Sequence, residues 1–342
     1  MDSLTRKTFK TSRSFEYTYY DTAPTKPLAA ETPTILLLHG FPDSAQFWKH
    51  VIPTLTTTLP HRILVPDLLG YGGTSKPTDP SAFASNLMAA DLAELLAHEQ
   101  IAKAIPTGHD WGSFLAQRFY LFYPSLCAGV ALLNVAYAPP SGQPFDLAAT
   151  NALLERTAGS GGRRSSFAYW ELFTAADGAA LVGRRLDRFW TALHGDRAHW
   201  MRDLWCGRGA MRAFLEEAAG GREDVPLRAY AQPGRGWRER WFGDVEAGGF
   251  ESPLCWYKAY AGNVSVEAES ALPRERLIVG VPVFFLGCSG DDVCLPAAIE
   301  PSREAGLLPD LKVKVIDAPH WCAMAEPEEV AKALLEFFGA RF

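Results

Sequence analysis

A short turn with a glycine at each end is the feature that most constrains this chain. It reads Gly108-His109-Asp110-Trp111-Gly112; the apolar run 103–106 precedes it, and residues 113–120 after it have helical periodicity. Glycines at this spacing let a strand and a helix approach closely, as in the turn that presents a nucleophilic serine. Here a carboxylate, Asp110, takes the nucleophile's position. A carboxylate nucleophile forms an ester by displacing a leaving group from a saturated carbon, which differs from attack on a carbonyl.

Buried strands alternate with helices toward both ends of the chain. The segments with strand character are apolar or rich in strand-forming residues, and they are 15–20, 34–38, 62–67, 128–135, 281–287 and 312–316. Helices are expected at 85–98, which has an apolar face, and at the closing segment 326–339. This alternation predicts an α/β fold with a mostly parallel sheet flanked by helices.

The middle of the chain breaks this pattern. Residues 141–272 lack buried strand runs and hold most of the tryptophans. We therefore expect residues 1–140 and 273–342 to form one α/β core, and residues 141–272 to form an inserted, mainly helical cap. Most of the cap's aromatic side chains would only pack its interior, but aromatic-rich segments of this kind also wall apolar ligand pockets.

Composition argues against several classes of protein. The 342 residues carry a formal net charge of −6, which gives no strong attraction to nucleic acid or to anionic membranes. No apolar run reaches the ~18 residues of a membrane span, and the polar start, Met1–Lys7, is not a secretory signal. The six cysteines form neither a C-x-x-C pair nor a zinc pattern. Free thiols in the cytoplasm are expected, and the oligomeric state is left open.

Three candidate catalytic side chains follow expected strands. Asp110 comes first, an acid in Gly290-Asp291-Asp292 comes second, and His320 comes third. Nucleophile, acid and histidine have this order in α/β hydrolases. Side chains that follow the carboxyl ends of parallel strands converge on one edge of the sheet. A single histidine is usually a packing residue, but its place in this series favours a catalytic role.

A fourth element, His39-Gly40-Phe41-Pro42, follows the apolar run 34–38. A tight turn here can direct the backbone N–H of Phe41 into the site. Together with the N–H of Trp111 it would form an oxyanion hole. The alternative is a plain turn, which the position of the segment ahead of the nucleophile disfavours.

Together these motifs resemble those of α/β-hydrolase-fold epoxide hydrolases of the soluble type. The matching segments, in chain order, are 39–42, 70–77, 108–112, the late acid and His320. The resemblance covers nearly the whole chain and is weakest in the cap. Haloalkane and fluoroacetate dehalogenases share the aspartate turn. Fluoroacetate dehalogenases, however, carry arginines where this chain has Trp111 and Phe114, and haloalkane dehalogenases usually carry Glu or Asn where it has Phe41.

The resemblance also implies a role for two tyrosines of the cap. Epoxide hydrolases of this family use two cap tyrosines to hold the epoxide oxygen. The segments 167–170 and 253–258 resemble those that contain them, so Tyr169 and Tyr257 are the expected pair. The family's spacing between the acid and a following proline, here Pro296, favours Asp291 over Asp292 as the acid.

The function that the resemblance implies is hydrolysis of a hydrophobic epoxide to a vicinal diol. Asp110 would form the ester, the two tyrosines would protonate the leaving oxygen, and His320 with Asp291 would activate water against the ester. The expected partners are a small hydrophobic epoxide and water, and no metal or organic cofactor is expected. The alternatives are an epoxide-opening cyclase, a hydrolytic dehalogenase and, with less support, a non-catalytic ligand receptor.

Overall fold

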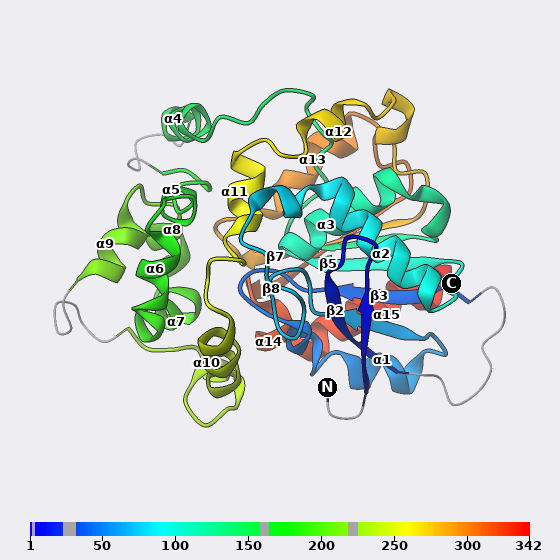
Figure 1. The fold of residues 1–342 in the computed structure, drawn as a ribbon, viewed down its shortest axis with the longest axis horizontal. Coiled ribbons are helices and arrows are strands. Elements are labelled where there is room, and N and C mark those ends of the chain that lie inside the picture. Colours follow the sequence, from blue (N-terminus) through cyan, green and yellow to red (C-terminus); the bar gives the residue numbers. More distant parts are fainter. Residues whose placement is uncertain (2–3, 23–31, 158–163, 218–224) are drawn as a thin grey trace.

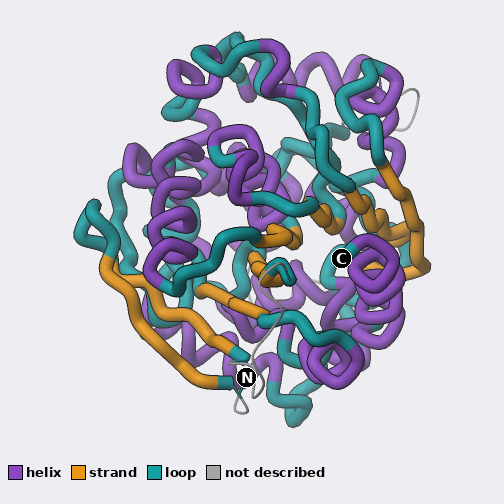
Figure 2. The backbone as a smooth tube through the Cα atoms, turned by 90° about the vertical axis from the view of Figure 1, so that its right-hand side faces the viewer, coloured by secondary structure: helices purple, strands orange, loops and turns teal. Residues whose placement is uncertain are grey.

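The computed structural model describes the chain except for residues 2–3, 23–31, 158–163 and 218–224. It contains an eight-stranded sheet with the order β1-β2-β4-β3-β5-β6-β7-β8. Figure 2 shows the strands in orange among the purple helices. The strands are β1 (Thr5–Lys10), β2 (Glu16–Asp21), β3 (Thr34–Leu38), β4 (Ile63–Pro66), β5 (Ala104–His109), β6 (Val130–Leu133), β7 (Val283–Gly290) and β8 (Leu311–Pro319). Neighbours from β4 to β8 are parallel, whereas β2 is antiparallel to β1 and β4. The expected α/β fold is confirmed.

Helices cover the sheet, and the central strands β3 and β5 consist entirely of buried residues. Helices α2 (Ser85–His98) and α3 (Trp111–Phe122) pack together on one face, and α1 (Ile52–Thr58) and α15 (Pro327–Arg341) pack together on the other (Figure 1). Helix α2 has the bounds expected from the sequence, and α15 begins and ends close to the expected closing helix. Strand β6 is shorter than its apolar run because the chain turns at Asn134, whose φ is 65°.

Between β6 and β7, the residues that the structure describes form helices and loops, with isolated β-bridges such as that of Gly195 with Leu227. The helices are α4 (Leu147–Thr157), α5 (Trp170–Phe173), α6 (Gly178–Gly183), α7 (Leu186–His194), α8 (Trp200–Trp205), α9 (Ala210–Glu216), α10 (Trp237–Gly248), α11 (Cys255–Ala261) and α12 (Val266–Ser270). Figure 1 shows α5 to α9 gathered to one side of the sheet. We keep the name cap for residues 141–272, and its boundaries remain a prediction. Two short helices, α13 (Glu300–Glu304) and α14 (Cys322–Ala325), complete the C-terminal part.

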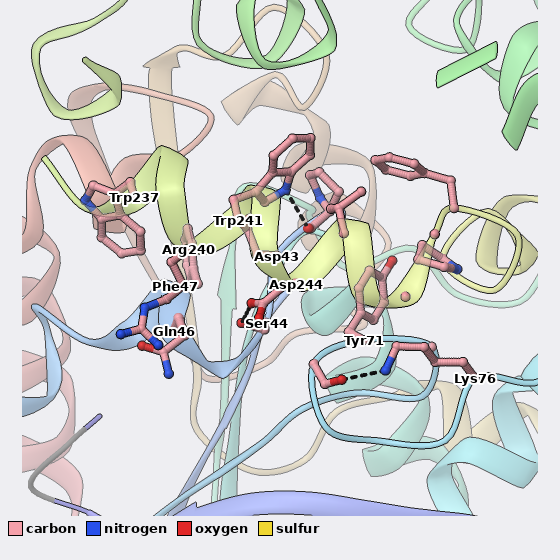
Figure 3. A pocket seen from close by; sticks show the side chains of 18 of the residues that line it. Asp43, Ser44, Gln46, Phe47, Tyr71, Lys76, Trp237, Arg240, Trp241 and Asp244 are labelled. Atoms are coloured by element: carbon pink, nitrogen blue, oxygen red, sulfur yellow. Dashed lines mark hydrogen bonds between the residues drawn. The ribbon is translucent and has the colours of Figure 1, made fainter. Parts of the chain in front are cut away.

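Indole groups of the cap donate hydrogen bonds to the backbone of the core. Trp241 Nε1 in α10 donates to the carbonyl oxygen of Pro42 over 3.1 Å (Figure 3), and Trp256 Nε1 in α11 donates to that of Leu69 over 2.9 Å. Pro42 lies in the turn after β3, and Leu69 lies in the turn after β4. The cap therefore rests on the loops at the carboxyl edge of the sheet. Among the described helices, none is long and apolar enough to cross a membrane.

Candidate active site

Asp110 lies at the sharp turn between β5 and α3. Its backbone has φ 53° and ψ −122°, a conformation that a residue with a side chain rarely adopts. A Cβ atom on Gly108 would overlap the backbone of Gly112, and a Cβ atom on Gly112 would overlap the carbonyl of Leu38. The two glycines are therefore needed for the close approach of strand and helix, and the turn projects Asp110 from the edge of the sheet.

Two backbone N–H groups donate hydrogen bonds to this carboxylate. The N–H of Phe41 donates to Asp110 Oδ1 over 2.8 Å, and the N–H of Trp111 also donates to the carboxylate. Burial raises the pKa of Asp110, while His320 and these two N–H groups oppose the shift; the net direction is upward. The structure thus brings together Phe41 and Trp111, the two residues expected to form an oxyanion hole, at the carboxyl group where an ester would form.

His320 lies between two carboxylates. Its Nδ1 is 2.6 Å from Asp291 Oδ2, and its Nε2 is 3.8 Å from Asp110 Oδ2. Burial alone would lower the pKa of His320, but the charge and hydrogen bond of Asp291, together with the charge of Asp110, raise it to about 9. The imidazole is therefore oriented by Asp291 and faces Asp110.

Asp291 is held from several sides. Its Oδ1 accepts hydrogen bonds from the N–H groups of Val293 (3.0 Å) and Cys294 (2.8 Å), and its Oδ2 accepts one from Asn134 Nδ2 (2.7 Å). Burial would raise the pKa of Asp291, but His320 and the hydrogen bonds from Cys294 and Asn134 lower it to about 2. Its neighbour Asp292 points elsewhere and accepts a hydrogen bond from the backbone of Arg202.

Exchange of these two acids for asparagine should have very different effects. Asp291→Asn is expected to lower kcat about 10⁴-fold, because the amide would stabilise the wrong tautomer of His320. The kcat of Asp292→Asn should stay within about twofold of that of the unchanged protein, because Asp292 does not contact His320. Steady-state rates of the two purified variants test this expectation, and equal losses would contradict it.

The cap supplies Tyr169, just before α5, and Tyr257, in α11. Their ring centroids are 5.8 Å apart, and the ring of Tyr257 lies 5.1 Å from that of Trp111. Burial first, and then the charge of Asp110 among other groups, raises the pKa of each phenol well above its ordinary value, so both remain protonated donors. Both tyrosines line one small cavity with Asp110 and His320, and its volume of about 10 Å³ is at the lower limit for one water molecule.

A larger cavity of about 200 Å³ extends from Asp110 along α3. Aromatic side chains dominate its wall, and they are Trp111, Phe114, Phe167, Tyr169, Trp170 and Tyr260. Polar side chains also reach it, among them those of Gln117 and Arg118. A mostly apolar cavity with a few polar groups is the usual form of a small-molecule site.

Sequence reasoning missed two side chains at this edge of the sheet. Asn134 directly follows β6 and donates to Asp291, and its place after a buried strand was a signal that could have found it. Asp43 follows the Phe41–Pro42 turn and accepts a hydrogen bond from Trp321 Nε1 over 3.2 Å. Burial and the charge of Asp110 raise its pKa to about 8. Asp43 also lines a separate cavity of about 40 Å³ beneath α10 (Figure 3).

One group of side chains in the described part of the chain could hold a metal ion. It consists of Asp291, Cys294 and His320, whose ligand atoms lie within 4.8 Å of one another. A metal bound there would compete with the hydrogen bond between Asp291 and His320. The donor set therefore fits a carboxylate–imidazole pair better, and we assign it no metal.

The chain belongs to the alpha/beta hydrolase fold family, whose model matches residues 33–327. Epoxide hydrolase A of Mycobacterium tuberculosis is 31% identical over 310 residues, which cover 89% of this chain and 90% of that protein. An epoxide hydrolase of Neurospora crassa is 30% identical over 322 residues, covering 90% of this chain and 86% of that protein. Within the family, these relatives place the chain among the epoxide hydrolases, as its motifs predict.

Solved structures agree on the fold. An epoxide hydrolase from an endophytic Streptomyces superposes with a TM-score of 0.78 at 23% identity, covering 99% of this chain and 96% of that one. Epoxide hydrolase A from Mycobacterium thermoresistibile superposes with a TM-score of 0.72 at 25% identity, covering 98% of both chains. At such identities the likeness is one of architecture.

Proposed function

We propose that this protein hydrolyses a hydrophobic epoxide to a vicinal diol through an ester on Asp110. One observation carries the proposal: a single small cavity is lined by the carboxyl group of Asp110, the phenols of Tyr169 and Tyr257, and His320, whose ring contacts Asp291. Each of these groups has a task in opening an epoxide and hydrolysing the resulting ester. The aromatic wall of the larger cavity supports a hydrophobic substrate.

In the first step, Asp110 Oδ2 attacks one carbon of the epoxide ring, and the bond from that carbon to the ring oxygen breaks. The departing oxygen receives a hydrogen bond and then a proton from Tyr169 or Tyr257. Oδ1 keeps the hydrogen bond from the N–H of Phe41, and the N–H of Trp111 still donates to the carboxyl group. The product is a β-hydroxyalkyl ester of Asp110.

In the second step, His320 takes a proton from a water molecule, and the resulting hydroxide attacks the carboxyl carbon of the ester. Asp291 stabilises the imidazolium that forms. Negative charge develops on Oδ1, to which the N–H of Phe41 already donates, and the N–H of Trp111 donates to the same carboxyl group. Collapse of this intermediate breaks the bond from the carboxyl carbon to Oδ2, and the imidazolium of His320 gives its proton to the departing diol oxygen. The proton of the new carboxyl group returns to the tyrosinate left by the first step, which restores the Asp110 carboxylate and the phenol.

Product analysis with aryl epoxides, alkyl epoxides and haloalkanes tests the proposal. We expect vicinal diols from the epoxides. A single turnover in ¹⁸O-labelled water, with enzyme in excess, should leave the label in Asp110 and not in the first diol, because the diol takes its new oxygen from the carboxylate. A label in the first diol would contradict an ester intermediate on Asp110. Halide release without diol would point to a dehalogenase, and a cyclic ether would point to a cyclase.

Removal of both phenolic hydroxyls should slow the first step. We expect Tyr169→Phe/Tyr257→Phe to reduce the rate of ester formation about 10²–10⁴-fold, because the departing oxygen loses its proton donors. Each single variant should lose less, because the other tyrosine remains. Rapid-quench measurement of the ester gives this rate.

Tyr137→Phe is the matched control for these variants. Tyr137 is also buried, but its hydroxyl donates to the carbonyl of Leu277 and lies outside the small cavity. Its exchange should leave the rate of ester formation unchanged. A comparable loss in this control would assign the effect of the double variant to folding.

A further inference from the structure

The larger cavity carries a charged side chain away from the reacting groups. Arg118 lies on α3 beyond Asp110 by a little over two helical turns, about 12 Å of rise. Both residues line the cavity, and the wall between them includes Trp111 and Phe114. The cavity therefore has a reactive end, an aromatic middle and a polar end.

The guanidinium of Arg118 is buried and only partly bonded. Its Nε donates to Glu269 Oε1 over 2.8 Å, and its Nη1 donates to the carbonyl of Ala138 over 2.9 Å and to Gln117 Oε1 over 3.5 Å. The guanidinium also lies over the ring of Phe114. Nη2 has no hydrogen-bond partner among the described residues. Nη2 is not fully enclosed, so it retains accessible surface. An unpaired but accessible donor on an otherwise buried side chain is available to an oxygen atom of a ligand in the cavity or to water.

The surroundings favour a neutral acceptor for this donor. The Glu269 carboxylate already balances the charge of Arg118, so the pair presents an N–H group without net positive charge. A substrate carboxylate would lose its hydration and would then face the carboxylate of Glu269. The amide of the adjacent Gln117 is already bonded to the backbone of Ala136 and Ala138.

We propose that the Arg118 end of the cavity is a subsite for a neutral oxygen of the substrate, such as a carbonyl, hydroxyl or ether oxygen. The preferred epoxide carries this oxygen at the far side of an apolar spacer from its ring. The inference rests on the proposed function, since it names the class of epoxide that the site takes. It differs from a purely structural role, in which Arg118 would only fasten α12 to α3 through Glu269.

Three terminal alkyl epoxides of equal chain length test the subsite; their far ends carry a methyl, a hydroxyl or a carboxylate group. The variant is Arg118→Met/Glu269→Met, because removal of the arginine alone would leave a buried, unpaired carboxylate. The readout is the ratio of kcat/KM for the hydroxyl epoxide to that for the methyl epoxide. We expect this ratio to fall by up to about tenfold in the variant, as for the loss of one ordinary hydrogen bond.

Arg188→Met/Glu217→Met is the matched control. Arg188 donates to the carbonyl of Phe214 and to Glu217, and it lies over the Phe214 ring, yet it lines none of the cavities described above. Damage to the fold would lower kcat/KM for both epoxides and leave their ratio unchanged.

Three results would contradict the subsite or the proposed function. An unchanged ratio in the Arg118 variant, with diol formed from all three epoxides, overturns the subsite alone. In a second result, the unchanged protein prefers the carboxylate epoxide and the Arg118 variant loses that preference. This result would mean that the subsite binds an anion, and it also overturns the proposal. The absence of diol from every epoxide with the unchanged protein overturns the proposed function, and the subsite with it.

Discussion

His320→Gln is expected to stop the reaction after the ester has formed. Glutamine cannot take a proton from water, so hydrolysis should slow by about 10²–10⁴-fold, the usual contribution of a general base. The attack by Asp110 does not use this base. Intact-protein mass spectrometry should therefore show the variant heavier by the full mass of the epoxide.

Asp110→Ala/His320→Gln is the control for this adduct, because it lacks the oxygen that would form the ester. An adduct that persists in the double variant would mean that another side chain is alkylated. An adduct from haloalkanes alone, lighter by the lost hydrogen halide, would replace epoxide opening by dehalogenation.

Asp110→Ala is expected to abolish turnover, with a loss of at least about 10⁴-fold in kcat, comparable to removal of other covalent nucleophiles. The reason is geometric as well as chemical. Asp110 is the only carboxylate among the described residues that line the small cavity. Asp291, the other carboxylate in contact with His320, does not line it. Diol formation from a saturating epoxide measures the loss, and turnover near that of the unchanged protein would contradict the mechanism.

Asp110→Asn separates chemistry from folding in this experiment. Asparagine keeps an oxygen that can accept the hydrogen bond from the N–H of Phe41, so the turn after β3 retains its partner. We expect this variant to lose turnover as Asp110→Ala does, while its unfolding temperature stays close to that of the unchanged protein. If only the alanine variant lost activity, the defect would lie in the fold.

Much of the fold could be predicted because its signals are local. The apolar run 34–38 forms β3, and the expected helix 85–98 is α2, because the local pattern of apolar residues specifies each element. The expected site residues lie together for a related reason: Asp110 and Asp291 directly follow β5 and β7, whose carboxyl ends share one edge of the sheet.

The parts that escaped prediction depend on contacts between distant segments. Asn134 reaches Asp291 because β6 lies between β5 and β7, an order that the apolar runs do not specify. The polar end of the cavity requires Arg118 and Glu269, which come from α3 and α12, to meet. Nothing in the local sequence around either residue indicates the other.

The position of His320 between two carboxylates has a consequence for the timing of the proposed reaction. The charge of Asp110 is one of the influences that raise the pKa of His320. When Asp110 becomes an ester, that charge is lost while Asp291 remains, so the imidazole holds its proton less tightly. The ring therefore becomes a competent base at the moment when there is an ester to hydrolyse. The loss of one negative charge at Asp110 thereby prepares His320 for the half-reaction that uses it as a base.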